Sequence, residues 1–127
     1  MEIFEEWLFK AERDLEGAVK LFEVGHSLPE LSVYHAQQCA EKSIKSFLAY
    51  KLQPIEKTHD LNRLINLAKE FEPKFNKLMS RAAFLNGFDI KYRYPGDELE
   101  PPDQETQNAI SFAQEILIFV KNIITLS

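Results

Sequence analysis

Residues 33–47 have the sequence VYHAQQCAEKSIKSF, and the spacing of their apolar side chains decides the fold. With a rotation of about 100° per residue, one face of a helix collects small and apolar side chains at every turn. The positions on this face are Val33, Ala36, Ala40, Ile44 and Phe47. The spacing predicts a helix with a buried face, running from about residue 28 to about residue 52. Ser27 is its expected N-cap, with Pro29 in the first turn, and Pro54 follows its end.

The same helical period occurs on both sides of this stretch. Residues 3–24 predict a first amphipathic helix, which we expect to end at Gly25. After the central helix, a third helix is expected to begin at Thr58 as the N-cap, with Asp60 in its first turn. These boundaries depend on residue types that satisfy unpaired backbone groups at helix ends.

Breakers divide the rest of the chain into two further helices. Pro73 precedes a fourth helical pattern that continues to about residue 85. Residues 94–102 are rich in proline and acidic side chains, which indicates an exposed loop before a last helix capped by Asp103. The sequence therefore predicts an all-α fold: a single domain over residues 1–127, built as an up-and-down bundle of about five helices.

Composition and charge exclude several classes of protein. The formal net charge of −5 argues against binding to duplex DNA through a general basic field, so any nucleic-acid contact must come from a local cluster. The single cysteine, Cys39, has no internal partner and is expected in the core. The acidic N-terminus does not resemble a secretion signal, and polar residues interrupt the apolar stretch 109–126. We expect a cytoplasmic protein with no membrane contact.

The central helix also carries a polar stripe beside its buried face. Tyr34, Gln38, Glu41 and Lys45 lie one above another, because their spacings are four, three and four. One interpretation is a solvated flank in which Glu41 and Lys45 form a surface ion pair. The other is a cleft in which the amide and the ammonium hold a base edge or a phosphate.

Two later segments have residue types that suit an anionic or aromatic ligand. Lys57 and His59 stand at the expected N-terminus of the third helix, where unpaired amides favour an anion; the alternative is a plain cap with an exposed histidine. The segment Lys91-Tyr92-Arg93-Tyr94 combines two cations with two rings, which suits a nucleotide or a single strand. Aromatic residues near helix ends also serve as packing anchors, so both interpretations remain open.

The order of these segments closely resembles the HEPN domain family, named for nucleotide binding in higher eukaryotes and prokaryotes. The segments are AERDL at 11–15, YHAQQCAEKSIK at 34–45, KTHDL at 57–61 and YRYP at 92–95. The resemblance covers nearly the whole chain and implies a four-helix core plus a short helix. It also implies a homodimer, and a small prokaryotic protein paired with a minimal nucleotidyltransferase in a toxin–antitoxin-like pair.

Many members of the family cleave RNA without a metal, using an arginine and a histidine separated by roughly four to six residues. That motif is absent here, because no histidine follows any of the four arginines at this distance. His59 and Arg93 are the remaining catalytic candidates, provided that they meet in space, whereas the helical wheel turns His35 away from the polar stripe. An enzyme is therefore the less favoured expectation. No cofactor is expected, and the histidine and cysteine spacings predict no metal site.

Three functions follow from these patterns. The first is a HEPN-type module that binds a nucleotide or RNA, with Arg93, Lys45 and Lys57 on phosphate, Tyr34 and Tyr94 stacking, and Gln38 and His59 forming hydrogen bonds. The second is a metal-independent ribonuclease acting as a toxin. The third is a purely structural helical dimer. The expected ligand-binding residues are Tyr34, Gln38, Glu41, Lys45, Lys57, His59, Arg93 and Tyr94.

Overall fold

The computed structural model describes residues 1–23, 27–96 and 98–126, and it contains helices but no strands in these ranges. The helices are α1 (Ile3–Lys20), α2 (Pro29–Tyr50), α3 (Leu61–Lys69), the 3-10 helix η1 (Pro73–Leu78), α4 (Met79–Leu85) and α5 (Asp103–Leu126). The prediction of an all-α bundle is confirmed. No helix in the described part of the chain is both long and apolar enough to cross a bilayer.

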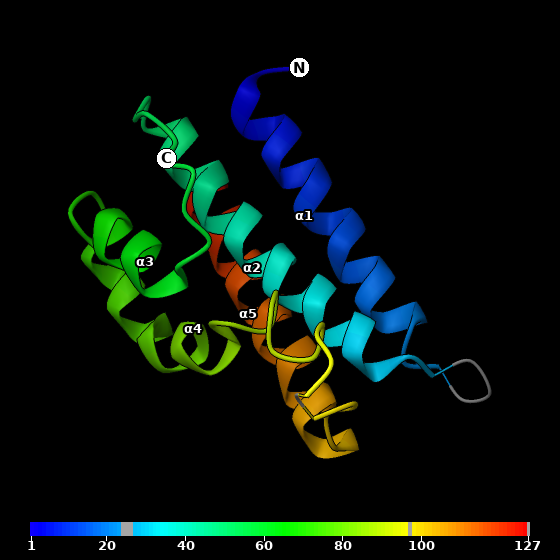
Figure 1. Ribbon diagram of the computed structural model, residues 1–127. Helices are drawn as coiled ribbons and strands as arrows, with labels where there is room; N and C mark the ends of the chain where they lie inside the picture. The colour runs from blue at the N-terminus through cyan, green and yellow to red at the C-terminus, as the bar shows by residue number, and fades with distance from the viewer. Residues whose placement is uncertain (24–26, 97, 127) are drawn as a thin grey trace.

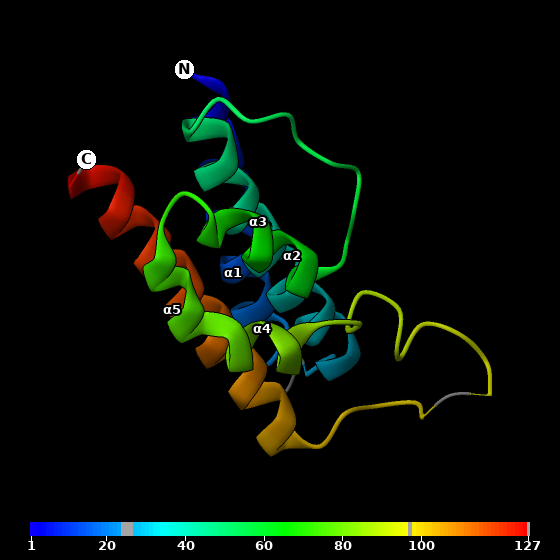
Figure 2. The same ribbon diagram turned by 90° about the vertical axis from the view of Figure 1, so that its left-hand side faces the viewer.

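The central helix of the bundle is α2. It packs against α1 on one side and α5 on the other, while α3 and α4 contact it from a third side. Figures 1 and 2 show that α2 and α5 run in the same direction and that α1 runs against both. The two chain ends consequently lie at the same end of the bundle.

Close packing around α2 makes the core. All five apolar positions that the wheel placed inside are fully buried: Val33, Ala36, Ala40, Ile44 and Phe47. The ring of Phe47 lies 4.7 Å from that of Phe75, whose ring lies 4.9 Å from that of Phe119, so aromatic contacts join α2, η1 and α5. The predicted core position of Cys39 is also confirmed, since its side chain is fully buried.

Several helix ends differ from their predicted positions. Helix α1 stops at Lys20, and the predicted end at Gly25 lies outside the described residues. Leu28, not Ser27, is the N-cap of α2, and it makes no side-chain cap. Because a proline at the first helical position has no N–H to satisfy, this helix needs less capping. Asp103 is the first residue of α5 and not its cap.

The third and fourth helices also differ from the predictions. Asp60, not Thr58, is the N-cap of α3, because its carboxylate accepts hydrogen bonds from the backbone N–H groups of Asn62 and Arg63. The Thr58 hydroxyl instead accepts from the Asp60 N–H and closes the preceding turn. The fourth helical pattern is divided into η1 and α4, with Pro73 at the start of η1.

Candidate functional site

A buried carboxylate organises the polar stripe of α2. The side chain of Glu41 is only 4% exposed, and its Oε2 accepts a hydrogen bond of 3.1 Å from Lys45 Nζ. Its Oε1 accepts one of 2.9 Å from His59 Nδ1 and a longer one of 3.4 Å from the Gln37 amide. The predicted ion pair between Glu41 and Lys45 is present, but the prediction that it lies on a solvated surface is wrong, because both side chains are buried.

Lys45 consequently has a different role from the predicted one. Its side chain is 6% exposed, its ammonium donates to Glu41, and Nζ lies 5.7 Å from the centroid of the Trp7 ring. A buried ammonium that already serves a carboxylate is not placed to contact a phosphate directly. Lys45 instead neutralises Glu41 and fixes the position of that carboxylate.

His59 is the exposed member of this network. Its side chain is 65% exposed although Nδ1 is bonded to the buried Glu41. A carboxylate on Nδ1 favours the tautomer that carries its proton there, and it leaves Nε2 as the ring atom available to a ligand. The Gln37 amide also donates to the His59 carbonyl at 3.4 Å, so both the ring and the backbone of His59 are tied to α2.

The amides at the start of α3 are not free to bind an anion. Asp60 occupies the N–H groups of Asn62 and Arg63, and the Asn86 Oδ1 accepts from the Leu61 N–H at 3.0 Å. The expected anion site at this N-terminus is therefore wrong, since the protein supplies its own acceptors. The exposed Lys57 side chain and the His59 ring remain as the polar groups of this segment.

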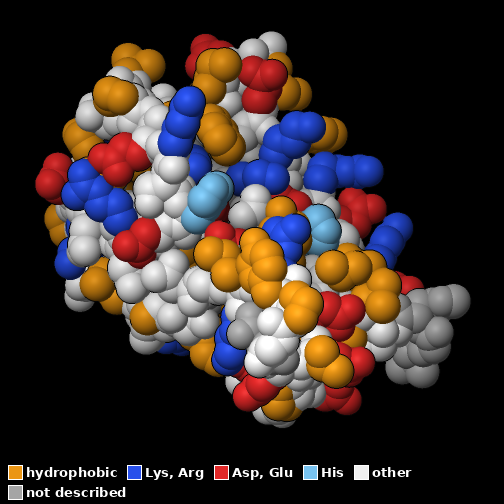
Figure 3. All heavy atoms as spheres, viewed as in Figure 1, with side chains coloured by type: hydrophobic (Ala, Val, Ile, Leu, Met, Phe, Trp, Pro, Cys, Tyr) orange, Lys and Arg blue, Asp and Glu red, His pale blue; other side chains and the backbone are white. Residues whose placement is uncertain are grey.

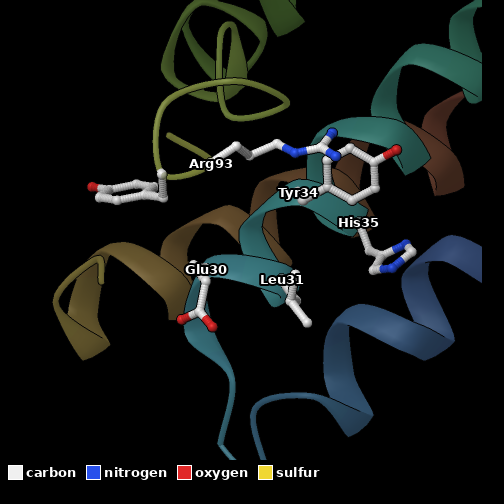
Figure 4. A pocket seen from close by; sticks show the side chains of 6 residues that line it. Glu30, Leu31, Tyr34, His35 and Arg93 are labelled. Atoms are coloured by element: carbon white, nitrogen blue, oxygen red, sulfur yellow. The ribbon is translucent and has the colours of Figure 1, made fainter. Parts of the chain in front are cut away.

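A pocket of about 320 Å³ lies nearer the N-terminal end of α2, where Arg93 meets Tyr34. Figure 4 shows the Arg93 side chain extended across the Tyr34 ring. The guanidinium carbon lies 4.9 Å from the ring centroid, which is the geometry of a cation–π contact. The pocket is lined by Glu30, Leu31, Tyr34, His35, Tyr92 and Arg93.

The other residues of the Lys91–Tyr94 segment have separate roles. Tyr92 is buried, and its hydroxyl donates to Glu105 at 2.9 Å, which anchors the segment to α5. Burial, together with the hydrogen bond to Glu105, raises the pKa of the Tyr92 hydroxyl. Tyr94 is 61% exposed and does not line the pocket, so the structure does not bring it to Tyr34.

The predicted convergence of Lys45, His59 and Arg93 is thus found only in part. Lys45 and His59 meet on Glu41, whereas Arg93 meets Tyr34. Tyr34 and Glu41 are separated by about 10 Å along α2, at about 1.5 Å per residue. Gln38 lies between them on the same stripe, and its amide donates to Gln37 Oε1 at 2.7 Å.

Sequence reasoning missed a second network on the α1 side of α2. Asp14 of α1 accepts from His35 Nδ1 at 2.9 Å and from Lys42 Nζ at 2.7 Å. The helical wheel predicts that His35 points away from the polar stripe, and this is confirmed. Its partner Asp14 lies on another helix, and a single sequence does not identify such a pair. Figure 4 shows His35 directed toward α1, at the edge of the pocket.

The described residues contain no group of three or more His, Cys, Asp or Glu side chains suited to a metal ion. The polar groups present are two imidazoles, a guanidinium over a ring, and amides held by buried partners. Such groups can bind phosphate, stack on a base and form hydrogen bonds with its edge.

The fold and these groups define a small all-α domain with polar groups arranged along its central helix. The family model of the HEPN domain matches residues 4–123, so the chain belongs to the HEPN domain family. The crystal structure of an archaeal HEPN homologue is 28% identical, with a TM-score of 0.76 over 98% of this chain and 99% of that one.

TT1696 from Thermus thermophilus is also similar. It is 25% identical, with a TM-score of 0.78 over 96% of this chain and 98% of that one. A comparison with curated proteins gives no significant match.

Proposed function

We propose that this HEPN domain binds a nucleotide or single-stranded RNA on the exposed side of the α2 stripe. The observation that carries the proposal is the pair of polar positions on one stripe: Arg93 over Tyr34 in a pocket, and an exposed His59 held by Glu41. A volume of about 320 Å³ lies at the lower end of the range for small-molecule sites.

The charge distribution supports an anionic ligand on this face. Although the net charge of the chain is −5, Figure 3 shows Lys and Arg side chains gathered over α1 and α2 beside histidines. A local cluster of this kind attracts an anion even when the molecule as a whole is acidic. The acidic balance elsewhere disfavours a long duplex, whose phosphates would meet the acidic surfaces.

Each polar residue has a role that its surroundings suit. Arg93 and the exposed Lys57 contact phosphate, and Tyr34 provides a ring for a base. Gln38 and His59 form hydrogen bonds with the ligand between these points. Glu41 and Lys45 act as positioning residues, because they are buried and hold His59 in place.

Titration calorimetry with the four nucleoside 5′-monophosphates and with a mixed-sequence RNA strand of about eight nucleotides tests the proposal. We expect Arg93→Ala to weaken binding by at least about tenfold, as expected for loss of a charge-assisted contact. Arg81→Ala is the matched control, because Arg81 lies 5.5 Å from the Phe112 ring and bonds to Glu115. If none of these nucleotides and RNA strands binds, the proposed function is disproved.

A metal-independent ribonuclease is the second candidate, and the hydrogen bond between His59 and Glu41 favours it. A carboxylate that fixes Nδ1 prepares Nε2 for proton transfer. RNA incubated with the protein in EDTA should then be cleaved, and both His59→Ala and Glu41→Gln should abolish cleavage. Intact RNA with the wild-type protein, under conditions in which it binds, excludes this candidate.

We also propose that the chain acts in the cytoplasm beside a minimal nucleotidyltransferase, as a toxin–antitoxin-like pair. Membership of the HEPN family supports this pairing. Co-purification with the nucleotidyltransferase encoded next to this chain, and relief of growth inhibition by co-expression, are the expected results. A neighbouring gene of unrelated type would remove the basis for it.

The predicted homodimer remains a proposal about the outer surface of α5. Ile118 is 49% exposed on this helix, whereas the adjacent Leu117 is 4% exposed and belongs to the core. Ile118→Glu should therefore shift a dimer to monomers in analytical ultracentrifugation without unfolding the chain. A wild-type monomer at all concentrations would contradict the proposal.

A further inference from the structure

A second aromatic position adjoins the far end of the α2 stripe. Trp7 on α1 lines a surface depression of about 260 Å³ together with Ile3, Glu6 and Lys10. These four residues lie on one face of α1, because their spacings are three, one and three. Lys45 connects the depression to the stripe, since its Nζ lies 5.7 Å from the Trp7 ring and bonds to Glu41.

We propose that the α2 face binds a single strand of several nucleotides, with one base on Tyr34 and another on Trp7. This inference rests on the proposed function and specifies its ligand. Tyr34 is separated by about 16 Å along α2, at about 1.5 Å per residue, from Lys45, whose Nζ lies 5.7 Å from the Trp7 ring. One mononucleotide does not span this distance, whereas a strand of a few nucleotides does.

The carboxylates in the two pockets suit the edges of bases, while Arg93 and Lys10, which line the same pockets, suit the phosphates next to those bases. Glu30 lines the pocket at Tyr34, and Glu6 lines the depression at Trp7. A carboxylate repels a phosphate but accepts hydrogen bonds from the amino groups of a base. Each pocket thus offers an aromatic ring for stacking and an acceptor for a base edge.

The cations and hydrogen-bond donors suit the backbone between these two bases. His59 is exposed and held by Glu41, between the level of Tyr34 and that of Lys45 on α2. Lys57 is exposed two residues before it, and Lys10 lines the depression beside Trp7. Arg93 supplies a further positive charge beside Tyr34, at the opposite end of the stripe from Trp7. Alternating rings and cations are typical of single-strand binding surfaces.

Trp7 is the only tryptophan of the chain, so its fluorescence reports ligand at this position directly. We would titrate wild-type protein with a mononucleotide and with unlabelled RNA strands of about two, four and eight nucleotides, following both heat and Trp7 emission. Affinity should rise by about tenfold or more between one and four nucleotides, because a second base stacks. Only the longer strands should quench Trp7.

Variants on α1 separate stacking from folding. Trp7→Leu should reduce the affinity for a fluorescein-labelled strand of about four nucleotides by roughly tenfold, but leave binding of a mononucleotide unchanged. Phe9→Leu is the control, because Phe9 is a 51% exposed ring on the same helix that lines neither pocket. Lys10→Gln should weaken binding of this strand, whereas Lys20→Gln at the other end of α1 should not.

The outcomes distinguish the two proposals. If a mononucleotide binds as tightly as the strand of about four nucleotides and Trp7 emission is unchanged, the proposed strand site from Tyr34 to Trp7 is overturned, while nucleotide binding itself is retained. No binding of any nucleotide or strand overturns both. If Trp7 emission changes with protein concentration but not with RNA, this face is a protein interface, and the proposed strand site from Tyr34 to Trp7 is also overturned.

Discussion

Glu41 has lost almost all contact with water while it accepts hydrogen bonds from three side chains. A buried charge is stable only when nearby groups replace its hydration, and Lys45 supplies the buried counter-charge. The exposed His59 ring therefore depends on a carboxylate that solvent does not reach. At this position a single side chain links the stability of the core to the geometry of the site.

Replacing Glu41 with Gln leaves the Lys45 ammonium buried without its counter-charge. We expect the free energy of unfolding to fall by about 3 kcal/mol, and Glu41→Gln/Lys45→Met to recover part of this loss. Urea unfolding followed by circular dichroism measures both changes. The control is Glu56→Gln, which breaks the exposed pair with Arg63 and should change little. An equally small effect at Glu41 would contradict the burial of the network.

The buried thiol of Cys39 gives stability a pH dependence with a defined sign. Burial raises the pKa of Cys39 from its usual 9.0 to about 12. Between these values the folded chain keeps a proton that the unfolded chain loses. Stability should therefore be unaffected by this group below about pH 9 and fall above it, by up to about 1.4 kcal/mol per pH unit.

The Cys39→Ala variant isolates this contribution from other groups that titrate in the same range, such as Lys91 and Tyr92, whose pKa values are also raised. The difference between wild-type and variant stability should diminish as the pH rises from about 9 to about 11. A constant difference would contradict a shifted thiol. At about pH 8 the native protein should also resist thiol reagents.

At the scale of elements, the segment between α2 and α3 determines how much of the polar stripe on α2 is covered. Helix α2 ends where Leu52 adopts a φ of 58° and the Gln53 N–H donates to the Leu48 carbonyl. The chain then returns along α2 and brings His59 to Glu41. A stripe that the wheel places beside the core is thereby partly covered.

Leu52 offers a direct test of this turn. Left-handed backbone is costly for a branched side chain, and that of Leu52 is 90% exposed, so it gains little packing in return. Leu52→Gly should raise the free energy of unfolding by about 0.5–1 kcal/mol. Gln53→Gly, one residue later, should not stabilise. Destabilisation by Leu52→Gly in urea unfolding would contradict the assigned conformation.

The N-cap of α3 provides a second test at this scale. Asp60→Ala removes the acceptor for two backbone N–H groups and for Asn86 Nδ2, so we expect a loss of about 1–2 kcal/mol. Thr58→Ala, at the cap predicted from the sequence, should cost less because its hydroxyl accepts only one N–H. Thermal unfolding compares the two. A larger effect at Thr58 would restore the sequence-based assignment.

The sequence predicted the elements better than their ends. Periodic apolar positions identify α1, α2 and α5, because burial of one helix face leaves a regular pattern. Thr58 and Asp60 both suit an N-cap, and the structure distinguishes them because the Asp60 carboxylate accepts from the N–H groups of Asn62 and Arg63. The Asn86 side chain, which follows α4 in the chain and also bonds to Asp60, could not be placed there from the sequence. The burial of Lys45 could not be predicted either, since the Trp7 ring that lies 5.7 Å from its Nζ belongs to another helix.

At the scale of the whole molecule, an acidic chain with Lys and Arg side chains gathered over α1 and α2 should bind RNA with a measurable dependence on salt. Contacts of Arg93, Lys57 and Lys10 with three phosphates predict a slope of about −2 for log K against log salt. Affinity for a strand of about eight nucleotides should then fall by about twentyfold between about 50 and about 200 mM salt. Fluorescence anisotropy measures this slope, and a value near zero would exclude phosphate contacts.

Asn86 lies at the start of the chain that leads to Arg93, and it is bonded to both Leu61 and Asp60, next to His59. The turn that presents His59 is thus held at two adjacent residues, by the His59–Glu41 hydrogen bond and by the Asn86–Asp60 hydrogen bond. The segment that carries Arg93 leaves the helices at this same Asn86. We therefore expect a substitution that releases Asn86 to affect the positions of both His59 and the Arg93 segment.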